Sequence, residues 1–186
     1  MIVVSAPSGA GKTTIVKYLL QTFPQLGFSV SATSRKIREG EKDGREYYFM
    51  SSDKFRSKIE QGKLLEWQEV YPDSFYGTPV SEVERITGNG QFPVFDVDVV
   101  GGLNIKKMYG DNALAIFIRP PSYEILEKRL RSRATDSEES LQKRLNKVKW
   151  ELSFEKDFDR VIVNDVLEDS FRMAEKLVEE FIGMKL

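Results

Sequence analysis

The chain lacks two residue types altogether, because its 186 residues include no cysteine and no histidine. Without cysteine there is neither a disulfide framework nor thiolate chemistry, and without histidine the commonest metal ligand and general base are missing. No apolar run approaches the roughly 20 residues that a membrane-spanning helix needs. The opening residues MIVVSAPS also lack the basic start and long apolar stretch of a signal peptide. We therefore expect a cytoplasmic protein without a membrane partner.

A strong excess of one charge is also absent, since 28 Lys and Arg stand against 29 Asp and Glu. This balance gives no general attraction to nucleic acid, so we expect no nucleic-acid partner. The charge is uneven locally, however, because residues 119–149 carry nine basic and five acidic side chains. A hydrophobic content of 40% and a charged content of 31% are ordinary for a soluble globular protein, and the length suits one domain.

The apolar patterns predict strands that alternate with helices. We predict strands at residues 1–5, 28–34, 64–70, 93–100, 113–119 and 160–165, with a helix as the alternative for 64–70. Helices are predicted at 12–23, 52–61, 79–86, 103–109, 122–130, 137–158 and 170–182, and Thr135 and Glu138 have the spacing of a capping box. Strands separated by helices indicate an α/β fold, with a parallel sheet covered by helices on both faces.

The segment SAPSGAGKTT, residues 5–14, lies between the first strand and the first helix. Backbone N–H groups in such a turn and at the helix start form a concavity that favours anions. The arrangement is that of a P-loop, in which Lys12 reaches the β- and γ-phosphates and the Thr13 hydroxyl reaches Mg²⁺. Ala6 stands where the strict pattern has glycine, and a glycine-rich turn without a ligand is the alternative. The candidate ATP-binding residues are Ala6, Pro7, Ser8, Gly9, Ala10, Gly11, Lys12, Thr13 and Thr14.

A second candidate anion site follows in SATSRKIREGEKDGREYYF, residues 31–49. Paired guanidinium groups, here Arg35 and Arg38, bring several donors in fixed planes to a phosphate, and a nearby phenol adds another. A solvated loop with unrelated charges is the alternative for these residues taken alone.

This stretch resembles the signature of the guanylate kinases. The matching residues are Ser31, Thr33, Ser34, Arg35, Arg38, Gly40, Glu41, Gly44, Tyr47 and Phe49. Ile37 and Glu46 depart from the common proline and aspartate. The resemblance continues through LLEWQEVYPDSFYGTP, VFDVDVVGG, IFIRPPSYEILEKRLRSRATDS and VIVND, so it covers nearly the whole chain in order.

The resemblance implies one guanylate kinase-like domain over residues 1–186, of the P-loop NTPase type. Its core would comprise residues 1–30, 92–124 and 158–186, with a GMP-binding insertion at 31–91 and a helical lid at 125–157. The family roles place Arg35, Arg38, Tyr47 and Tyr76 on the GMP phosphate. The guanine would be read by Ser31, Glu66 and Thr78.

The role of Glu66 also makes chemical sense. Guanine presents two adjacent donors, N1–H and N2–H₂, and an ionised carboxylate presents two matching acceptors. Adenine has an acceptor at N1, which would face an oxygen of the carboxylate. The buried polar groups of the site would then go unpaired, so the site would reject adenine. Without the resemblance, a surface carboxylate on a strand is the more ordinary interpretation of Glu66.

Asp96 and Asp98 are two positions apart in a predicted strand, so both would face the same side. They lie where an apolar strand ends, which suits ligand binding beyond the carboxyl ends of parallel strands. The resemblance assigns Asp96 and Asp98 to the substrate site, with Asp98 also a candidate for the water shell of an Mg²⁺ held by Thr13. A turn with solvated acids is the alternative.

The basic segment 119–149 also acquires a role through the resemblance. Arg133 and Arg144 match lid arginines that fold over the phosphates and, with Lys12, would stabilise the charge of phosphoryl transfer. Arg129, Arg131 and Lys143 are more simply solvated helix charges. Asn164 is expected to approach the adenine of ATP.

The predicted reaction is ATP + GMP giving ADP + GDP, assisted by Mg²⁺ and without a dedicated general base. Acceptance of dGMP stays open, as does the choice between monomer and homodimer. One alternative is another small-molecule kinase on the same scaffold. The other is a guanylate kinase-like interaction module that no longer catalyses.

Overall fold

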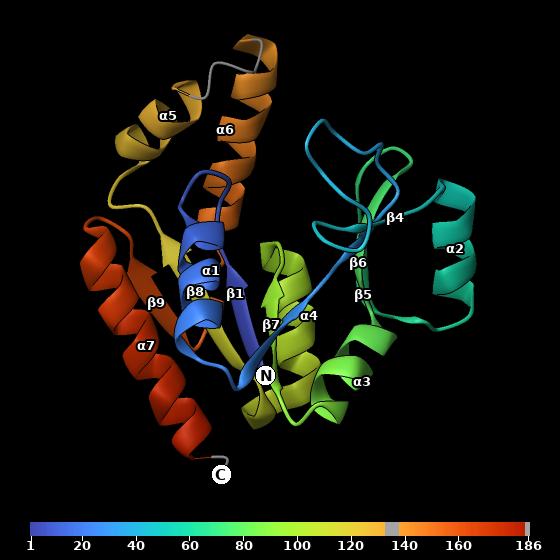
Figure 1. The fold of residues 1–186 in the computed structure, drawn as a ribbon. Coiled ribbons are helices and arrows are strands. Elements are labelled where there is room, and N and C mark those ends of the chain that lie inside the picture. Colours follow the sequence, from blue (N-terminus) through green and yellow to red (C-terminus); the bar gives the residue numbers. More distant parts are fainter. Residues whose placement is uncertain (133–137, 185–186) are drawn as a thin grey trace.

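The computed structural model describes residues 1–132 and 138–184, and of residues 138–140 and 143 it describes the backbone alone. Five parallel strands form the main sheet in the order β2-β7-β1-β8-β9 (Figure 1). These strands are β1 (Ile2–Ser5), β2 (Leu26–Ser29), β7 (Phe92–Asp96), β8 (Leu114–Arg119) and β9 (Arg160–Val163). The predicted α/β fold with a parallel sheet is therefore confirmed.

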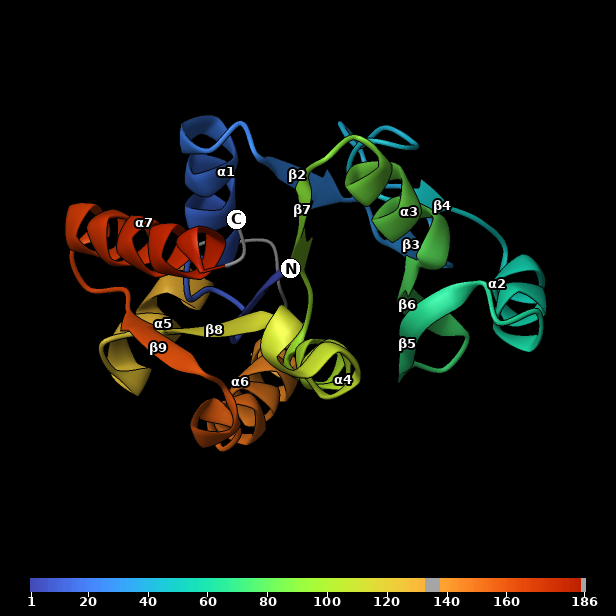
Figure 2. The same ribbon diagram turned by 90° about the horizontal axis from the view of Figure 1, so that it is seen from below.

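Side chains alternate between the two faces of the main sheet and join two separate clusters. Ile2 and Val4 pack under helices α1 (Lys12–Thr22) and α7 (Leu167–Gly183), whereas Val3 packs on the other face against α4 (Val99–Tyr109). Figure 2 shows α1 and α7 on one side of the strands and α4 and α6 on the other. Both faces of the sheet are thus covered, as the sequence predicts.

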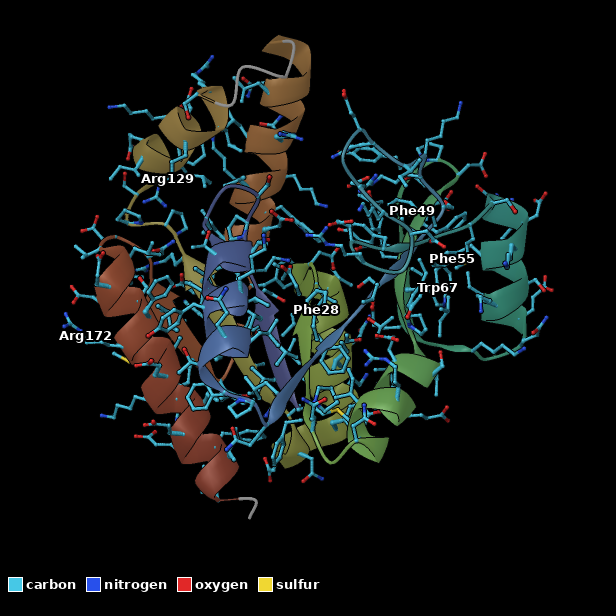
Figure 3. All side chains as sticks on the ribbon, in the orientation of Figure 1. Phe28, Phe49, Phe55, Trp67, Arg129 and Arg172 are labelled. Carbon is cyan, nitrogen blue, oxygen red and sulfur yellow. The ribbon has the colours of Figure 1, made fainter. Side chains whose placement is uncertain are left out.

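A second, four-stranded sheet has the order β4-β3-β6-β5 and stands beside the main one (Figure 1). Its strands are β3 (Ala32–Thr33), β4 (Tyr48–Phe49), β5 (Leu64–Tyr71) and β6 (Ser74–Pro79). Helix α2 (Ser52–Glu60) covers one face, where the Phe55 ring stacks on Phe75 with centroids 5.4 Å apart (Figure 3). Residues 64–70 are therefore strand, as predicted, and the helical alternative is wrong.

Residues 28–34, predicted as a strand that emerges into a polar loop, hold parts of two strands, because β2 ends at Ser29 and β3 begins at Ala32 in a different sheet. At the break, the Val30 N–H donates to Glu82 Oε2 at 2.9 Å, so it leaves the strand ladder. Glu82 belongs to α3 (Val80–Gly88), which is 52 residues further along the chain. An apolar run carries no local signal of such a distant acceptor.

The strand predicted at 93–100 is also too long, since β7 ends at Asp96 and α4 begins at Val99. The Asp98 carboxylate caps this helix by accepting the Gly101 N–H at 2.8 Å. Gly101 and Gly102 weaken the helical pattern at the start of α4 in the sequence, because glycine is a poor helix former. Close packing requires the second glycine, since a Cβ on Gly102 would lie 2.4 Å from Ser5 Oγ.

Helices α5 (Tyr123–Arg131) and α6 (Glu138–Leu152) project above the main sheet (Figure 1). Leu126, Leu130, Leu141 and Leu145 attach both helices to the main core. Helix α6 ends earlier than the predicted residue 158, and a short 3₁₀ turn follows at Glu155–Asp157. The predicted capping box of Thr135 and Glu138 lies outside the described residues and side chains. Among the helices that the structure describes, none has the length and apolarity to cross a membrane.

Candidate functional site

The phosphate loop connects β1 to α1 and needs glycine at two points. Gly9 and Gly11 have φ angles of +90° and +97°, a region that side-chain-bearing residues rarely adopt. Ala6, the departure from the strict pattern, has no such requirement, because the positive φ angles of the described residues belong to glycines and to Asp73. Its methyl group packs into the main core. An alanine is therefore compatible with the loop at this position.

Lys12 and Thr13 open α1, and both contact Asp96 at the end of β7. Lys12 Nζ forms an ion pair with Asp96 Oδ1 and donates to the Val97 carbonyl at 3.0 Å. Thr13 Oγ1 donates to Asp96 Oδ2 at 3.1 Å. Three residues predicted from two separate motifs thus meet at the carboxyl edge of the main sheet, where open α/β sheets bind ligands.

A cavity of about 320 Å³ extends from this edge to the second sheet. Four parts of the chain form its walls: the phosphate loop, the β7–α4 connection, the second sheet and α6. The lining residues are Ser8, Lys12, Ser31, Tyr47, Glu66, Gln68, Val70, Tyr76, Gly77, Asp96, Val97, Asp98 and Lys147. The structure therefore brings together most of the predicted GMP-binding residues and the phosphate loop.

Glu66 lies in one wall of the cavity and is 8% exposed. Its Oε1 accepts the Thr78 hydroxyl at 2.7 Å, and Oε2 lies against Gly101, where an added Cβ would be 2.7 Å away. Burial raises the pKa of Glu66 to about 7, although the Thr78 hydrogen bond acts in the opposite direction. Asp98 nearby adds to the rise in pKa through its negative charge. No cation pairs with Glu66 among the described residues.

Arg35 lies beside the cavity-lining Tyr47, in a bidentate ion pair with Glu41. Its two terminal nitrogens donate to Glu41 Oε2 and Oε1 at 2.7 and 2.6 Å, and the guanidinium lies 5.0 Å from the Tyr47 ring centroid. This pairing raises the pKa of Arg35 and lowers the pKa of Glu41 to about 2. The Tyr47 and Tyr76 rings meet edge-on with their centroids 5.8 Å apart. Burial raises the pKa of the Tyr47 phenol.

Some predicted residues have other surroundings. Arg38 is exposed, and its backbone N–H donates to Glu41 Oε2 at 2.8 Å. Arg144 is half-buried on α6, whereas Arg133 lies outside the described residues. Asn164 is buried behind the phosphate loop and donates to the Ala10 carbonyl at 2.7 Å. The Thr14 side chain is exposed.

Some residues of the site were not among those predicted: Gln68, Val70 and Lys147 line the cavity, and Glu151 lies beside the phosphate loop. Gln68 and Val70 follow Glu66 at alternate positions of β5, so they share its face. The Gln68 Oε1 atom is buried and has no hydrogen-bond partner within the described part of the chain.

Lys147 and Glu151 belong to α6. The charged sequence of this helix predicts that both side chains are exposed to solvent. Glu151 is buried beside the loop, and its burial raises its pKa.

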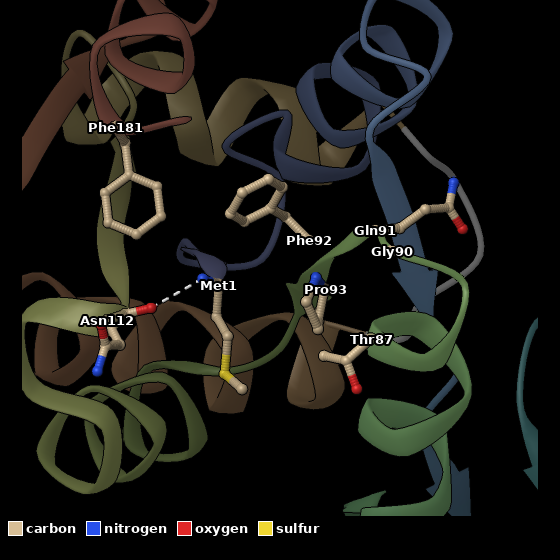
Figure 4. Close-up of a pocket in the computed structure, with 8 residues that line it drawn as sticks. All are labelled: Met1, Thr87, Gly90, Gln91, Phe92, Pro93, Asn112 and Phe181. Atoms are coloured by element: carbon tan, nitrogen blue, oxygen red, sulfur yellow. Dashed lines mark hydrogen bonds between the residues drawn. The ribbon is translucent and has the colours of Figure 1, made fainter. Parts of the chain in front are cut away.

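Another cavity, of about 270 Å³, lies at the opposite edge of the main sheet (Figure 4). Its walls include Met1, Phe92 and Phe181, and the Met1 amino group donates to the Asn112 carbonyl at 2.8 Å. Met1 precedes β1 and Phe92 begins β7, so this is the amino edge of the strands. Ligands of such sheets bind at the carboxyl edge, which favours the larger cavity as the functional site.

A phosphate loop at the carboxyl edge of a parallel sheet, with a second sheet facing it across a polar cavity, defines a P-loop kinase of small substrates. Residues 1–181 match the family model described as guanylate kinase. A guanylate kinase of Bacteroides fragilis is 51% identical over 184 residues, which cover 99% of this chain and 90% of that protein. A guanylate kinase of Salinibacter ruber is 46% identical over 183 residues, covering 98% and 97%.

A solved structure agrees with these sequences. The crystal structure of guanylate kinase from Anaplasma phagocytophilum has a TM-score of 0.77 at 31% identity, covering 97% of this chain and 85% of that one. The chain belongs to the guanylate kinase family, and it is therefore an enzyme of the nucleoside monophosphate kinase class. The resemblance found in the sequence is confirmed.

Proposed function

We propose that the cavity between the two sheets holds GMP beside the phosphate loop for the reaction ATP + GMP giving ADP + GDP. The protein phosphorylates GMP with ATP, as its family membership implies. The observation that carries the assignment of the cavity is Glu66, a buried carboxylate whose donors within the described chain come from Thr78. A ligand with two adjacent N–H donors is the complement of such a group.

The acceptor nucleotide is oriented by the second sheet and by the carboxyl edge of the main sheet, which face each other across the cavity. Glu66, Thr78 and Ser31 bind the guanine, and Asp96 and Asp98 complete the substrate site at the edge of the main sheet. Tyr47, Tyr76, Arg35 and Arg38 bind the phosphate. In the described structure the Arg35 guanidinium is paired with the Glu41 carboxylate, so the GMP phosphate must compete with this carboxylate for Arg35. Bidentate binding of either anion to Arg35 is favourable, which makes the exchange feasible.

ATP binds with its phosphates on the loop, from Ala6 to Thr14, and Lys12 neutralises the β- and γ-phosphates. The residues present also fit Mg²⁺, because the Thr13 hydroxyl and the Asp96 carboxylate place oxygen atoms together at the helix start. Mg²⁺ at kinase sites is commonly held by one or two protein oxygens together with the substrate phosphates. When bound, Mg²⁺ would supply charge neutralisation of those phosphates.

The transfer itself needs positioning and charge rather than proton removal. A GMP phosphate oxygen is already anionic, so the absence of histidine is no obstacle. Lys12 lies at the site, and Arg144 with Arg133 would bring further positive charge from the lid. Lys147, on the same helix as Arg144, lines the cavity and adds a cation there. Cations of this kind lower the barrier by meeting the charge on the transferred group.

This function divides the single domain into three parts. Residues 1–30, 92–124 and 158–186 form the core, residues 31–91 bind GMP, and residues 125–157 form a lid. Closure of the lid and of the GMP-binding part would exclude water, which otherwise competes as the acceptor.

The test is the release of ADP from Mg-ATP with a panel of acceptors: GMP, dGMP, AMP, UMP, dTMP and ribose 1,5-bisphosphate. Fast turnover with GMP, and not with AMP or the pyrimidines, is the expected result. Equal turnover with AMP would contradict the role of Glu66, and turnover with ribose 1,5-bisphosphate alone would identify a different kinase. No turnover with any acceptor, by folded protein that binds GMP, would favour an interaction module.

A further inference from the structure

Asn164 joins the end of β9 to the back of the phosphate loop. Its side chain is 5% exposed, and Nδ2 donates to the Ala10 carbonyl at 2.7 Å. Its Oδ1 accepts the hydroxyl of Ser170 at 3.1 Å, from the first turn of α7. Both ends of the amide therefore have a partner inside the protein.

The Ala10 carbonyl, which can only accept, determines which end of this amide faces the loop. The Ser170 hydroxyl, which lies 3.1 Å from Asn164 Oδ1 and 3.0 Å from the Val166 carbonyl, supports that orientation. A flipped amide would place Oδ1 against the Ala10 carbonyl, so two acceptors would face each other, and the hydroxyl would lose its Asn164 acceptor. The backbone of Asn164 is also held, because its N–H donates to the Arg119 carbonyl at 2.8 Å and its carbonyl accepts from the Arg129 guanidinium at 3.2 Å. Figure 3 shows Arg129 on α5. Asn164 is thus anchored to three different elements.

The loop and Asn164 are in close contact. A Cβ on Gly11 would lie 2.2 Å from Asn164 Nδ2, so no larger residue fits beside this amide without a shift. In a trans peptide, the carbonyl of one residue and the N–H of the next point in opposite directions. A hydrogen bond that holds the Ala10 carbonyl toward Asn164 therefore turns the Gly11 N–H away from it, toward the other side of the loop.

We propose that Asn164, supported by Ser170, is a positioning residue that aims the Gly11 N–H of the phosphate loop at the phosphates of ATP. This inference rests on the proposed role of the loop in binding ATP. It differs from the adenine contact that the resemblance implies, because a positioning residue acts on every ligand that carries the phosphate chain, whatever its base. Ser170 shares the role although it is buried and separated from the loop by Asn164.

Two variants and one control separate the two roles. Asn164→Leu removes the hydrogen bond at similar volume, and Ser170→Ala removes the hydroxyl that supports the amide. Asn104→Leu makes the same chemical change at an exposed position of α4. The measurements are the dissociation constant of inorganic tripolyphosphate, which has no base, and kcat/KM with ATP, CTP and UTP. The melting temperature and the KM for GMP are recorded for each protein.

For Asn164→Leu we expect tripolyphosphate to bind about tenfold more weakly, with an equal loss of kcat/KM for all three donors. For Ser170→Ala the loss is about threefold. Asn104→Leu should match the wild type in both measurements, and the KM for GMP should be unchanged in every variant.

A loss confined to ATP, with normal tripolyphosphate binding, would overturn the proposal in favour of an adenine contact. Normal binding by a folded Ser170→Ala protein would overturn the supporting role of Ser170 even if Asn164→Leu does not fold. Failure of the wild-type protein to bind tripolyphosphate would remove the premise, whereas a different acceptor preference would leave the proposal intact.

Discussion

Glu66 and Glu82 are both buried glutamates of the segment between β3 and β7, with exposed fractions of 8% and 2%. Glu82 lies where the main sheet passes into the second one, and Glu66 lies in the cavity wall. They differ in the donors that the chain supplies to them. Glu82 accepts the Val30 N–H at 2.9 Å, the Tyr48 hydroxyl at 2.9 Å, and two nitrogens of Arg85 at 3.0 and 2.8 Å.

The consequences for the two acids are opposite. Burial acts to raise the pKa of Glu82, but the hydrogen bonds from Arg85, Val30 and Tyr48 outweigh it and the pKa is lowered. Burial raises the pKa of Glu66 to about 7, because Thr78 alone does not offset it. A buried carboxylate that is satisfied by its own chain stabilises the fold. One left short of donors is suited to a ligand that brings them.

The largest expected effect is on catalysis and comes from Glu66→Gln. The amide replaces one acceptor by a donor, which would face a donor of guanine. We expect kcat/KM for GMP to fall by roughly 10²- to 10³-fold, as buried polar groups left unpaired require. Stability at neutral pH should not fall, because the buried charge is removed. Steady-state rates with GMP and AMP, with urea unfolding as the control, test this; a loss below tenfold would contradict it.

Glu82→Gln should show the reverse pattern. Removing the charge leaves Arg85 without its carboxylate, and the free energy of unfolding should fall by about 2 kcal/mol, below the usual range for a fully buried pair because Arg85 is half-exposed. For the folded protein, kcat/KM for GMP should stay within about threefold of the wild type. Urea unfolding and the same kinetic assay provide both numbers. A large kinetic loss without destabilisation would erase the distinction between the two acids.

The pH dependence of stability should sharpen the comparison further. The pKa of Glu66 is raised from its usual 4.5 to about 7 in the folded protein, so the folded state holds this proton more tightly. The stabilisation is therefore complete below pH 4.5 and is lost as the pH rises through 7. Between pH 5 and 8 the wild type should lose about 2 kcal/mol relative to Glu66→Gln. A difference between the two proteins that does not vary with pH would exclude this titration.

The smallest effect is expected from Thr78→Val, which removes the hydroxyl at similar volume. Glu66 loses its donor, so its pKa should rise further, and kcat/KM for GMP should fall about fivefold. Thr87→Val is the matched control, because the Thr87 hydroxyl donates to the Val83 carbonyl of its own helix. A larger fall in kcat/KM for GMP in Thr78→Val than in Thr87→Val would support the Glu66–Thr78 pair, and equal falls in the two variants would count against it.

The features that the sequence predicts well are local. The phosphate loop occupies consecutive residues between a strand and a helix, so its shape follows from nearby glycines and the flanking pattern. Alternation in β5 likewise predicts which side chains share a face with Glu66. Lys12 and Asp96 are each predicted from the local pattern around a strand end, and only the pairing of β1 with β7 in the structure brings them together.

The features that the sequence does not predict depend on distant partners. The break between β2 and β3 is held by Glu82, and PVSEVERI shows only a charged helix in sequence. The bond from Asn164 to Ala10 joins residues 154 positions apart, so the signature VIVND cannot indicate it. Lys147 reaches the cavity and Glu151 reaches the loop because α6 packs against the core, and the charged sequence of α6 does not indicate this packing.

The most direct test is a carbon-13 NMR titration of the Glu66 carboxyl group, assigned with Glu66→Gln, in the free protein and with saturating GMP. We expect a midpoint near pH 7 in the free protein. We also expect a fall of at least one unit with GMP, because the guanine donors favour the ionised form. A free midpoint at the usual 4.5, or one that GMP does not lower, would contradict the assignment of Glu66 as the carboxylate that reads guanine.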